Sequence, residues 1–297
     1  MMLFVFPAYE RLALGLDLPV LERGRFSVRR FPNQELCIDL DAIPTGRSCV
    51  ILGSVAPPDE YLLSTLLLSH TLKKEGAHKV TALLPYLGYS RQDKEEAGKS
   101  LGTAWLGQAL RASGVNDVVT VDVHSPSVQQ LFPIPVYSLS PAGIFADEIA
   151  RLSLTGATLV APDEGALDRC EAVRREANMK RPLAYFKKTR TAEAVRHSVL
   201  HGEVGPQAVI VDDILDTGGT LISACETLRR AGVQEIIVMV THGLFTGSLW
   251  ERLWSLGVGR IYCTDTAPLP PRLASTRIAV LSVAPLLCDY LAPRGAG

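Results

Sequence analysis

The sequence lacks the features that mark several large classes of protein. None of its apolar runs reaches 18 residues, so no segment is long enough to cross a membrane as a helix. The opening residues, MMLFVFPAYERLAL, carry neither a basic leader nor a small-residue cleavage site and do not resemble an export signal. The 30 basic residues nearly balance the 31 acidic ones, giving a net charge of −1. We therefore expect neither a membrane nor a nucleic acid as a partner.

Paired cysteines are absent as well. The six cysteines are scattered along the 297 residues, and no two of them form a C-x-x-C pair. This spacing argues against a structural zinc site and against a disulfide framework. Because dispersed cysteines fit a reducing compartment, we expect a cytoplasmic protein. Hydrophobic residues make up 47% of the chain, which is enough to bury a core in each of two domains.

Short apolar runs alternate with amphipathic stretches along the chain. The runs are rich in Val and Ile and too short to be helices, which predicts strands. Several are apolar throughout, a pattern typical of a parallel sheet that is covered on both faces. The sequence therefore predicts an α/β fold with strands at 80–86, 118–123, 157–162, 208–213, 235–242, 260–265 and 278–283.

The stretch 59–76 is a clear helix candidate between these runs. Asp59 is suited to cap its first turn, and Lys73 and Lys74 suit its last turn. Four leucines share one face in helical spacing, which predicts the buried side of the helix. They are Leu62, Leu63, Leu66 and Leu67.

A recurring glycine joint indicates how the chain is organised. Four helical stretches end in a glycine that is followed closely by a strand, because glycine adopts the left-handed conformation that ends helices. These glycines are Gly76, Gly114, Gly232 and Gly257. Such joints occur in every α/β protein, but their arrangement as two pairs favours two related domains. We predict domains at 1–140 and 141–297, meeting in the proline-rich stretch 133–144, with the C-terminal helix packing back on the first domain.

The segment VIVDDILDTGGTL, residues 209–221, combines acids with a glycine-rich turn. Asp212 and Asp213 follow an apolar strand, and ligands bind at the carboxyl ends of parallel strands. The acids can accept hydrogen bonds from vicinal hydroxyls, directly or through a divalent cation. Backbone N–H groups at the start of the next helix favour a phosphate. A sugar phosphate satisfies both features, whereas a surface turn with solvated acids does not explain why the acids follow a wholly apolar strand.

This segment resembles the ribose-5-phosphate loop shared by type I phosphoribosyltransferases and ribose-phosphate pyrophosphokinases. The resemblance implies that the loop binds ribose 5-phosphate, with its phosphate on the backbone amides of Thr217–Thr220. The implied binding residues are Asp212, Asp213, Asp216, Thr217, Gly218, Gly219 and Thr220. The loop alone does not separate enzymes that consume 5-phosphoribosyl 1-diphosphate (PRPP) from enzymes that make it.

The segment RFPNQELCIDL, residues 30–40, resembles the part of the pyrophosphokinases that contacts the adenine of ATP. The family usually carries Asp-Gly-Glu there, so Glu35 matches while Asn33 and Gln34 depart from the pattern. Phe31 also matches, and its ring could stack on a base while Glu35 accepts from an amino group. The alternative is an ordinary edge strand. The departures leave the choice of nucleotide donor open.

The segment LLPYLGYSRQDK, residues 83–94, resembles the family's Tyr-x-x-Tyr-x-Arg-Gln-Asp segment, which contacts ATP phosphates. Arg91 offers a planar fork for phosphate oxygens, and Gln92 offers a neutral donor. Lys94 stands where many members have arginine. A single loop arginine is more often a solvated charge, but the length of the match favours an ATP-binding role.

Two polar residues at strand ends resemble the family's magnesium-binding positions. His124 follows the strand VVTVDV, and the matching family histidine binds the magnesium–ATP complex. Asp163 follows ATLVAP, in a segment similar to the family's Pro-Asp-x-Gly motif. A lone histidine commonly packs or makes a supporting hydrogen bond, and Mg²⁺ prefers oxygen ligands. The resemblance nevertheless implies that His124 and Asp163 bracket one Mg²⁺ ion.

The segment AYFKKTRTAEAVR, residues 184–196, resembles the family's mobile catalytic loop, which carries Lys-x-Arg. Lys188 and Arg190 match, and they would point the same way in an extended chain. Cations that neutralise the transferred group are the main catalysts of phosphoryl-type transfer. The resemblance implies that both are catalytic and that Arg190 also contacts the ribose 5-phosphate. Solvated charges at a strand end are the alternative.

These motifs follow the family's order over about residues 30–290, so the chain is identified as a member of the ribose-phosphate pyrophosphokinases. The resemblance implies two phosphoribosyltransferase-type domains, each a mainly parallel sheet with helices on both faces, the first binding ATP and the second ribose 5-phosphate. It also implies Mg²⁺, a homo-oligomer, and the reaction of ATP with ribose 5-phosphate to PRPP and AMP. A PRPP-consuming phosphoribosyltransferase and a non-catalytic regulatory paralogue remain the alternatives.

Overall fold

The structure is a computed structural model that describes residues 1–190, 196–269, 273 and 277–292. The side chains of residues 188–190 and 196–198 also lie outside the description. The chain forms two compact units: unit 1 comprises Met1–Leu139 and the residues from Ala284 onward, and unit 2 comprises Ser140–Val283. Among the described residues, no helix combines the length and apolar character that a membrane span requires.

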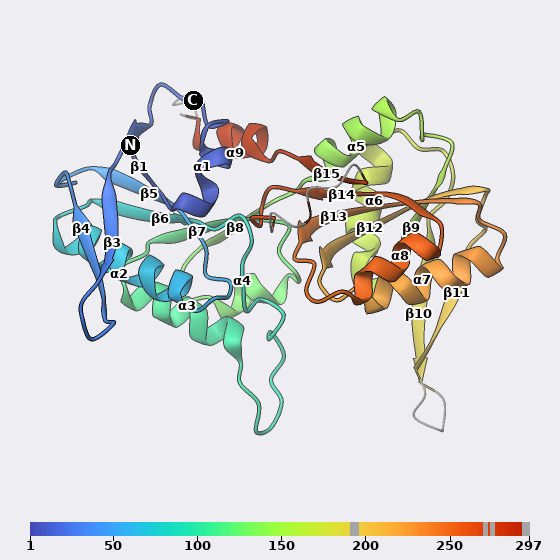
Figure 1. Ribbon diagram of the computed structural model, residues 1–297, viewed down its shortest axis with the longest axis horizontal. Coiled ribbons are helices and arrows are strands. Elements are labelled where there is room, and N and C mark those ends of the chain that lie inside the picture. The colour runs from blue at the N-terminus through green and yellow to red at the C-terminus, as the bar shows by residue number, and fades with distance from the viewer. Residues whose placement is uncertain (191–195, 270–272, 274–276, 293–297) are drawn as a thin grey trace. The chain divides into compact units, whose positions relative to one another are not determined.

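Unit 1 is built on a six-stranded parallel sheet in the order β2-β1-β5-β6-β7-β8 (Figure 1). Its strands are β1 (Met2–Val5), β2 (Glu22–Arg23), β5 (Ser48–Leu52), β6 (Lys79–Leu83), β7 (Asp117–Val121) and β8 (Val136–Leu139). The described helices are α1 (Glu10–Ala13), α2 (Glu60–Lys74), α3 (Gly102–Ala112), α4 (Ser127–Leu131) and α9 (Ala284–Leu291), with a 3-10 turn η1 (Pro7–Tyr9). A separate antiparallel hairpin is formed by β3 (Phe26–Arg30) and β4 (Leu36–Leu40).

Unit 2 is built on a seven-stranded sheet in the order β11-β10-β9-β12-β13-β14-β15. Its strands are β9 (Thr158–Ala161), β10 (Ala184–Arg190), β11 (Arg196–His201), β12 (Gln207–Leu215), β13 (Glu235–Gly243), β14 (Val258–Thr264) and β15 (Ile278–Leu281). The described helices are α5 (Ala142–Arg151), α6 (Leu167–Glu176), α7 (Gly219–Arg230) and α8 (Arg252–Ser255), with 3-10 turns η2 (Glu164–Ala166) and η3 (Leu249–Glu251). Only β10 and β11 pair antiparallel among the described strands of this sheet.

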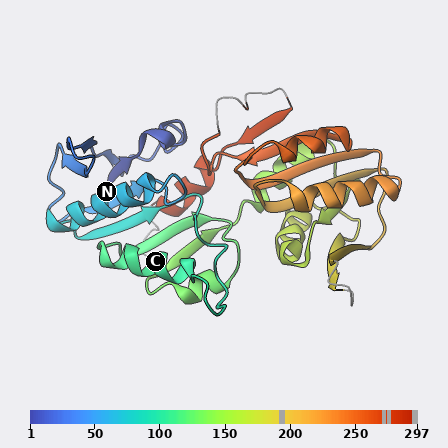
Figure 2. The same cartoon turned by 60° about the horizontal axis from the view of Figure 1, so that its bottom comes forward.

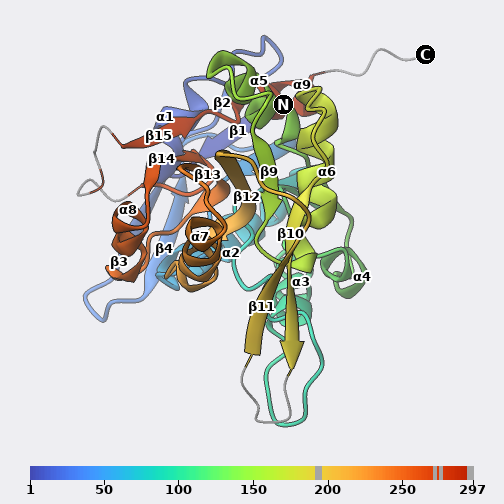
Figure 3. The ribbon, with the colours of Figure 1, turned by 90° about the vertical axis from the view of Figure 1, so that its right-hand side faces the viewer.

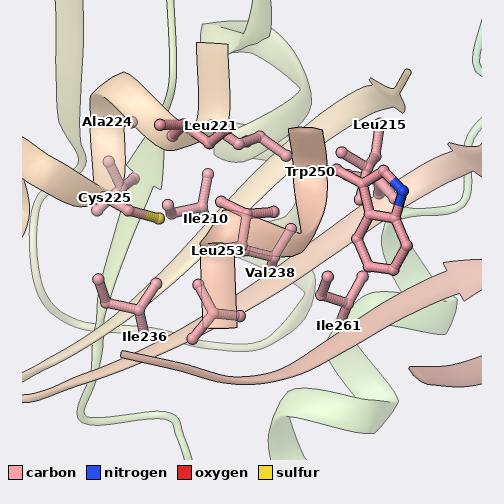
Figure 4. Packing of buried hydrophobic residues seen from close by; sticks show 14 of the residues in the cluster. Ile210, Leu215, Leu221, Ala224, Cys225, Ile236, Val238, Trp250, Leu253 and Ile261 are labelled. Carbon is pink, nitrogen blue, oxygen red and sulfur yellow. The ribbon is translucent and has the colours of Figure 1, made fainter. Parts of the chain in front are cut away.

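Both faces of the unit 2 sheet are buried, which explains its continuous apolar strands. Along β12, Ile210 packs on the side of α7 and α8, while its neighbours Val209 and Val211 pack on the side of α5 and α6. Figures 1 and 2 show α7 lying along one face of the sheet, and Figure 1 shows α5 and α6 on the opposite face. Figure 4 shows the packing on the α7 side, where Leu221 and Cys225 meet Ile210 and Val238. The predicted parallel sheet with helices on both faces is confirmed here.

The predicted strands lie within or overlap β6, β7, β9, β12, β13, β14 and β15. The predicted buried face of α2 is confirmed only in part: Leu62 is buried and Leu66 is half-buried, whereas Leu63 is 53% exposed and Leu67 is 37% exposed. The helix instead buries Thr65 and Ser69 beside other leucines. Their hydroxyls donate within the unit, Thr65 Oγ1 to the Ser54 carbonyl at 2.9 Å and Ser69 Oγ to the Thr65 carbonyl at 2.8 Å. Satisfied hydroxyl groups are inexpensive to bury, so this face is less apolar than the pattern suggested.

The glycine joints are confirmed as left-handed helix ends. The φ angles are +84° at Gly76, +98° at Gly114, +92° at Gly232 and +85° at Gly257. By contrast, the predicted cap at Asp59 does not form: Asp59 occupies the position before α2, but its side chain makes no capping bond. Its Oδ1 instead accepts from the Tyr89 hydroxyl at 2.8 Å. A tertiary partner has therefore replaced the local one.

Candidate active site

The acids of segment 209–221 lie at the carboxyl end of β12, a central strand of unit 2. The partner β9 pairs with β12 only as far as Ile210, whereas β13 pairs on to Leu215. Asp212 and Asp213 therefore lie just beyond the end of β9, where one neighbour has stopped. Asp213 is 7% exposed, and Asp212 is half-buried. The backbone N–H of Asp213 donates to Asp212 Oδ1 at 3.0 Å.

The turn after these acids leads directly into α7. Gly218 occupies the N-cap position with φ +87°, a left-handed conformation that side-chain-bearing residues resist. Thr217, Gly219 and Thr220 are exposed at the start of the helix. The first N–H groups of a helix have no partner within it, and they carry the positive end of the helix dipole. The turn thus has the geometry of an anion site, as the sequence predicted.

Three carboxylates and one guanidinium gather at this edge of the sheet. Asp163 follows β9 and caps η2, accepting from the Gly165 N–H at 3.0 Å. Arg169 on α6 lies with Nη2 4.0 Å from Asp213 Oδ2, and their side chains are only 11% and 10% exposed. Desolvation chiefly raises the pKa of Asp212 well above its ordinary value, and the charge of Asp213 raises it further. Arg169 opposes this shift, while Asp163 adds to it.

The crowding of these acids makes the site receptive to a cation or to hydroxyl donors. Carboxylate oxygens are the ligands that Mg²⁺ prefers, and Mg²⁺ usually takes only one or two of them together with water and substrate phosphates. The donor set therefore fits the ion. Within the part of the chain that the structure describes, no group of three or more His, Cys, Asp or Glu side chains is arranged to hold a metal by itself. Of the two predicted ligands, Asp163 belongs to unit 2 and His124 to unit 1.

In unit 1, the predicted adenine-contacting residues lie on the exposed end of the β3–β4 hairpin. Phe31 is 44% exposed, and Asn33, Gln34 and Glu35 are exposed beside it. The turn closes through the Phe31 N–H, which donates to the Glu35 carbonyl at 2.9 Å. Asn33 Oδ1 accepts from the Glu35 N–H at 3.2 Å. An exposed ring beside polar acceptors is compatible with stacking on a base.

The predicted phosphate-contacting residues lie on the loop between β6 and α3, which projects from unit 1 in Figure 1. Arg91 and Gln92 are exposed on this loop. Gln92 is held there, because its carbonyl accepts from the Thr103 N–H at 3.2 Å and its Oε1 accepts from Ser100 Oγ at 2.8 Å. Asp93 connects this loop to the segment after β7: its Oδ2 accepts from Ser125 Oγ at 2.5 Å and from Ser127 Oγ at 2.6 Å.

His124 comes directly before Ser125 in the sequence, and its side chain is exposed. The hydrogen bonds of Asp93 therefore bring the Arg91–Gln92 loop next to the histidine segment within unit 1. His124 also has a share in holding Asp93 ionised: burial raises the pKa of Asp93, but bonds from Ser125 and Ser127 and the nearby His124 bring it below its ordinary value. Two of the motifs assigned to ATP are thus neighbours in space.

The predicted catalytic pair, Lys188 and Arg190, lies in a stretch where the structure describes the backbone but not the side chains. The backbone of Lys188 and Arg190 lies in β10, but their side chains are outside the described part of the structure. Strand β10 pairs with β9 only at Ala184 and Tyr185, and its remaining residues pair with β11 alone. Figure 3 shows the two strands running on together beyond the rest of the sheet. The roles of Lys188 and Arg190 stay predictions.

Two residues of this chemistry were missed at the sequence level. Arg169 lies on the same side of α6 as the buried residues Ala166, Cys170 and Val173. A cation on the buried side of a helix was therefore the clue that the sequence offered. Such a cation requires a partner, and its partner is an acid of the candidate sugar site. Asp93 matches the aspartate of the family segment, but its partners Ser125 and Ser127 are more than thirty residues away, so its role in joining two segments was not visible.

Comparison with known proteins identifies both units. Residues 10–114 match the family described as the N-terminal domain of ribose phosphate pyrophosphokinase, and residues 134–251 match the phosphoribosyl transferase domain family. A ribose-phosphate pyrophosphokinase from Campylobacter jejuni is 30% identical over 278 residues, covering 93% of this chain and 88% of the relative. Another, from Caldanaerobacter subterraneus, is 34% identical over 283 residues, covering 94% of this chain and 87% of the relative.

A solved structure agrees with these relatives. The crystal structure of phosphoribosylpyrophosphate synthetase from Mycobacterium smegmatis has a TM-score of 0.87 and 28% identity, covering 97% of this chain and 96% of that chain. The predicted α/β fold with two phosphoribosyltransferase-type domains is thereby confirmed. Identity of 30% or more over most of both chains shows the family. The chain belongs to the ribose-phosphate pyrophosphokinase family.

Proposed function

We propose that this protein transfers the diphosphoryl group of ATP to the anomeric hydroxyl of ribose 5-phosphate, giving PRPP and AMP for nucleotide biosynthesis. One observation carries the proposal: buried acids and a left-handed glycine turn stand together at the end of β12. In this arrangement the acids serve hydroxyl groups and the helix start serves a phosphate, so a phosphorylated sugar satisfies both. Membership of the pyrophosphokinase family supplies the second substrate and the reaction.

The phosphate of ribose 5-phosphate binds the backbone amides of Thr217, Gly218, Gly219 and Thr220 in this proposal. Asp212 and Asp213 accept hydrogen bonds from the sugar hydroxyls, and Asp216 orients the same end of the ligand. These interactions fix the anomeric hydroxyl for attack. Holding the nucleophile in place converts a bimolecular reaction into one between positioned groups, which is a large part of enzymatic rate enhancement.

The nucleotide belongs to the residues of unit 1. The ring of Phe31 stacks on the base, with Asn33, Gln34 and Glu35 beside it, and Arg91 and Gln92 donate to the phosphates. When bound, Mg²⁺ supplies positive charge that offsets the triphosphate, and His124 and Asp163 would hold it. Lys188 and Arg190 donate to the diphosphoryl group as charge develops during transfer. The bond from the β-phosphorus to the α,β-bridging oxygen breaks, AMP leaves, and the proton of the anomeric hydroxyl is lost to the medium.

Incubation of the purified chain with ribose 5-phosphate, ATP and Mg²⁺ tests the proposal. Chromatography should find AMP and PRPP in equal amounts, and both should require ribose 5-phosphate. ADP in place of AMP would indicate transfer of a single phosphoryl group and contradict the proposal. Release of diphosphate from PRPP with a free base would instead identify a PRPP-consuming transferase, which the match of residues 10–114 to the pyrophosphokinase N-terminal domain argues against.

The same proposal includes a cytoplasmic homo-oligomer. The dispersed cysteines support the compartment, since oxidising compartments favour cysteines in pairs. Light scattering during size-exclusion chromatography measures the number of chains directly. A chain that assembles with another synthetase but makes no AMP would point to a regulatory paralogue.

A further inference from the structure

The turn that carries the proposed phosphate site rests on a second layer of the chain, which we call the supporting segment, residues 244–250. It begins where β13 ends, directly beside the end of β12. The Leu244 and Phe245 N–H groups both donate to the Leu215 carbonyl, at 2.9 and 3.0 Å. The Thr246 N–H donates to the Asp216 carbonyl at 3.1 Å. These bonds fix the backbone at the point where the strand becomes the turn.

The far end of the supporting segment reaches the next part of the turn. A Cβ built on Gly218 would lie 2.8 Å from Trp250 Cα and 2.9 Å from Trp250 Cβ. Gly218 is therefore packed directly against the backbone of η3, in addition to needing its left-handed φ of +87°. The position of Trp250 sets how close the turn lies to the rest of unit 2.

Trp250 is itself firmly anchored. Its side chain is buried, with the residue 3% exposed, and its indole Nε1 donates to the Gly247 carbonyl at 3.2 Å. Its ring meets Phe245 edge to face at a centroid distance of 4.9 Å, and Phe245 is fully buried despite a φ of +50°. Trp250 and Leu215 belong to one hydrophobic cluster, the one drawn in Figure 4. Packing of this kind holds a residue in a backbone conformation that it would otherwise avoid.

We propose that Trp250 is a positioning residue for ribose 5-phosphate: it acts through Gly218 and holds the amides of residues 217–220 so that they converge on the phosphate. The indole is the anchor that presses η3 against Gly218. Without it, the supporting segment loses a ring contact and an N–H···O bond, and the turn can move away. Amides that no longer converge bind the phosphate less well, while groups that act on the nucleotide are unaffected. This inference rests on the proposed function of the same turn.

Trp254, which is half-buried and packs against the same hydrophobic cluster, provides a control. It is one helical turn further on, and its ring meets Trp250 at a centroid distance of 6.0 Å. The guanidinium of Arg277 lies 4.1 Å from its ring centroid, so this tryptophan packs toward β14 and β15. Trp254→Ala removes a side chain of the same size that packs against the same hydrophobic cluster. It should lower stability without a matching loss of ribose 5-phosphate affinity.

The test measures steady-state rates and calorimetric binding of ribose 5-phosphate for the full chain. Trp250→Ala should raise KM and Kd for ribose 5-phosphate roughly 10- to 100-fold, as expected for a displaced binding group, with kcat and KM for ATP changed less than about 3-fold. Trp250→Phe keeps a buried ring and should recover most of the affinity. Equal affinity in wild type and Trp250→Ala, or an equal loss in Trp254→Ala, would overturn the proposal.

Two further measurements keep the inference testable if Trp250→Ala folds poorly. Gly218→Ala places a methyl group against the Trp250 backbone and should raise KM for ribose 5-phosphate in the same way. In a Trp250→Leu background, which removes the ring contact with Phe245 and the N–H···O bond to Gly247 but keeps an apolar side chain, the effect of Gly218→Ala should be smaller than in the wild type, because the two residues act through one contact. Fully additive effects would contradict the inference. Wild-type protein that does not bind ribose 5-phosphate at all would instead contradict the proposed function.

Discussion

The β12–α7 turn of unit 2 and the β3–β4 hairpin of unit 1 are assigned to the two substrates of one reaction, yet they are held by different means. The turn follows a central strand, and three N–H groups of the supporting segment donate to its backbone. The hairpin is a two-stranded sheet of its own, and Phe31 at its end is 44% exposed. The hairpin is held by side-chain packing, since Phe26, Ile38 and Leu40 pack against the core of unit 1.

This difference indicates which groups determine the specificity of each site. A phosphate is bound by backbone amides, so its site depends on the fold and on glycine rather than on particular side chains. A base is bound by side chains, so a change of residue at its site changes which base is preferred. Of the departures from the family pattern, Asn33 and Gln34 lie on the exposed hairpin and Lys94 lies on the loop between β6 and α3, while the residues of the turn match the pattern. The four predictions that follow test this division, from the largest expected effect to the smallest.

The largest effect is expected outside both elements, at Lys188. Lys188→Ala should lower kcat by roughly 10²- to 10⁵-fold, in the range of groups that stabilise transferred phosphoryl charge. Both KM values should change little, because binding is assigned to the turn and the hairpin. Initial rates under saturating substrates measure the loss. The neighbouring Lys187, which pairs with Glu164 at 3.7 Å, is the control, since Lys187→Ala should retain near-normal turnover. A folded Lys188→Ala enzyme with full activity would remove this residue from the mechanism.

The next effect should be confined to the sugar side. Asp216→Ala should raise KM for ribose 5-phosphate roughly 10- to 100-fold, which corresponds to the loss of a hydrogen bond to a charged group. KM for ATP should stay constant because the nucleotide is assigned to unit 1. Rates measured against each substrate in turn separate the two values. If only KM for ATP changed, Asp216 would contact the nucleotide and its assignment to the ribose 5-phosphate site would be wrong.

A smaller effect is expected at the hairpin. Phe31→Ala should raise KM for ATP by about tenfold, consistent with the loss of one ring stacked on a base. The melting temperature should not move measurably, since the ring is substantially exposed and contributes little buried surface. Phe31→Tyr keeps the stacking surface and is the matched control. A drop in stability equal to that of a core variant would show that the ring is structural.

The smallest effect concerns stability and distinguishes the two adjacent acids. The pKa of Asp212 is raised by desolvation and by the charge of Asp213, so the folded state holds the Asp212 proton at pH values where the unfolded chain has lost it. Stability therefore falls as the pH rises from the ordinary carboxyl pKa through the raised folded value, and the full cost remains above it. Asp212→Asn should raise the melting temperature of the ligand-free protein near neutral pH by about 2–4 °C. The gain should shrink toward pH 4.

Asp213→Asn is the control for that prediction and should act in the opposite direction. Asp213 lies 4.0 Å from the largely buried Arg169, and Asp213→Asn removes the attraction between these two charges. Calorimetric melting curves of both variants across the pH range give the comparison. Equal shifts of the same sign would show that Arg169 does not distinguish the two carboxylates.

The parts of the molecule that the sequence predicts well are those with local causes. The strand 208–213 is visible from its apolar run, and Gly232 from its place after a helix, because backbone preference and burial act over a few residues. The turn at Gly218 was predicted in the same way. Its left-handed φ and its closeness to Trp250 are two separate reasons for glycine, and only the first can be anticipated from the turn itself.

The parts that could not be predicted depend on partners distant in the chain. Asp59 bonds to Tyr89 instead of capping its helix, and Asp93 receives its bonds from Ser125 and Ser127. The buried side of α2 includes Thr65, whose hydroxyl bonds to the Ser54 carbonyl, so leucine spacing alone gave the buried face only in part. The assignment of ATP to the first domain and ribose 5-phosphate to the second remains a prediction, because it too depends on residues that are distant in the chain.

The structure of the protein with ribose 5-phosphate and a non-hydrolysable ATP analogue bound tests the central claim most directly. The 5-phosphate should lie within hydrogen-bonding distance of the N–H groups of Thr217–Thr220, with the sugar hydroxyls directed toward Asp212 and Asp213. A complex in which the sugar phosphate binds elsewhere, or in which this turn is covered by packed side chains, would contradict the account.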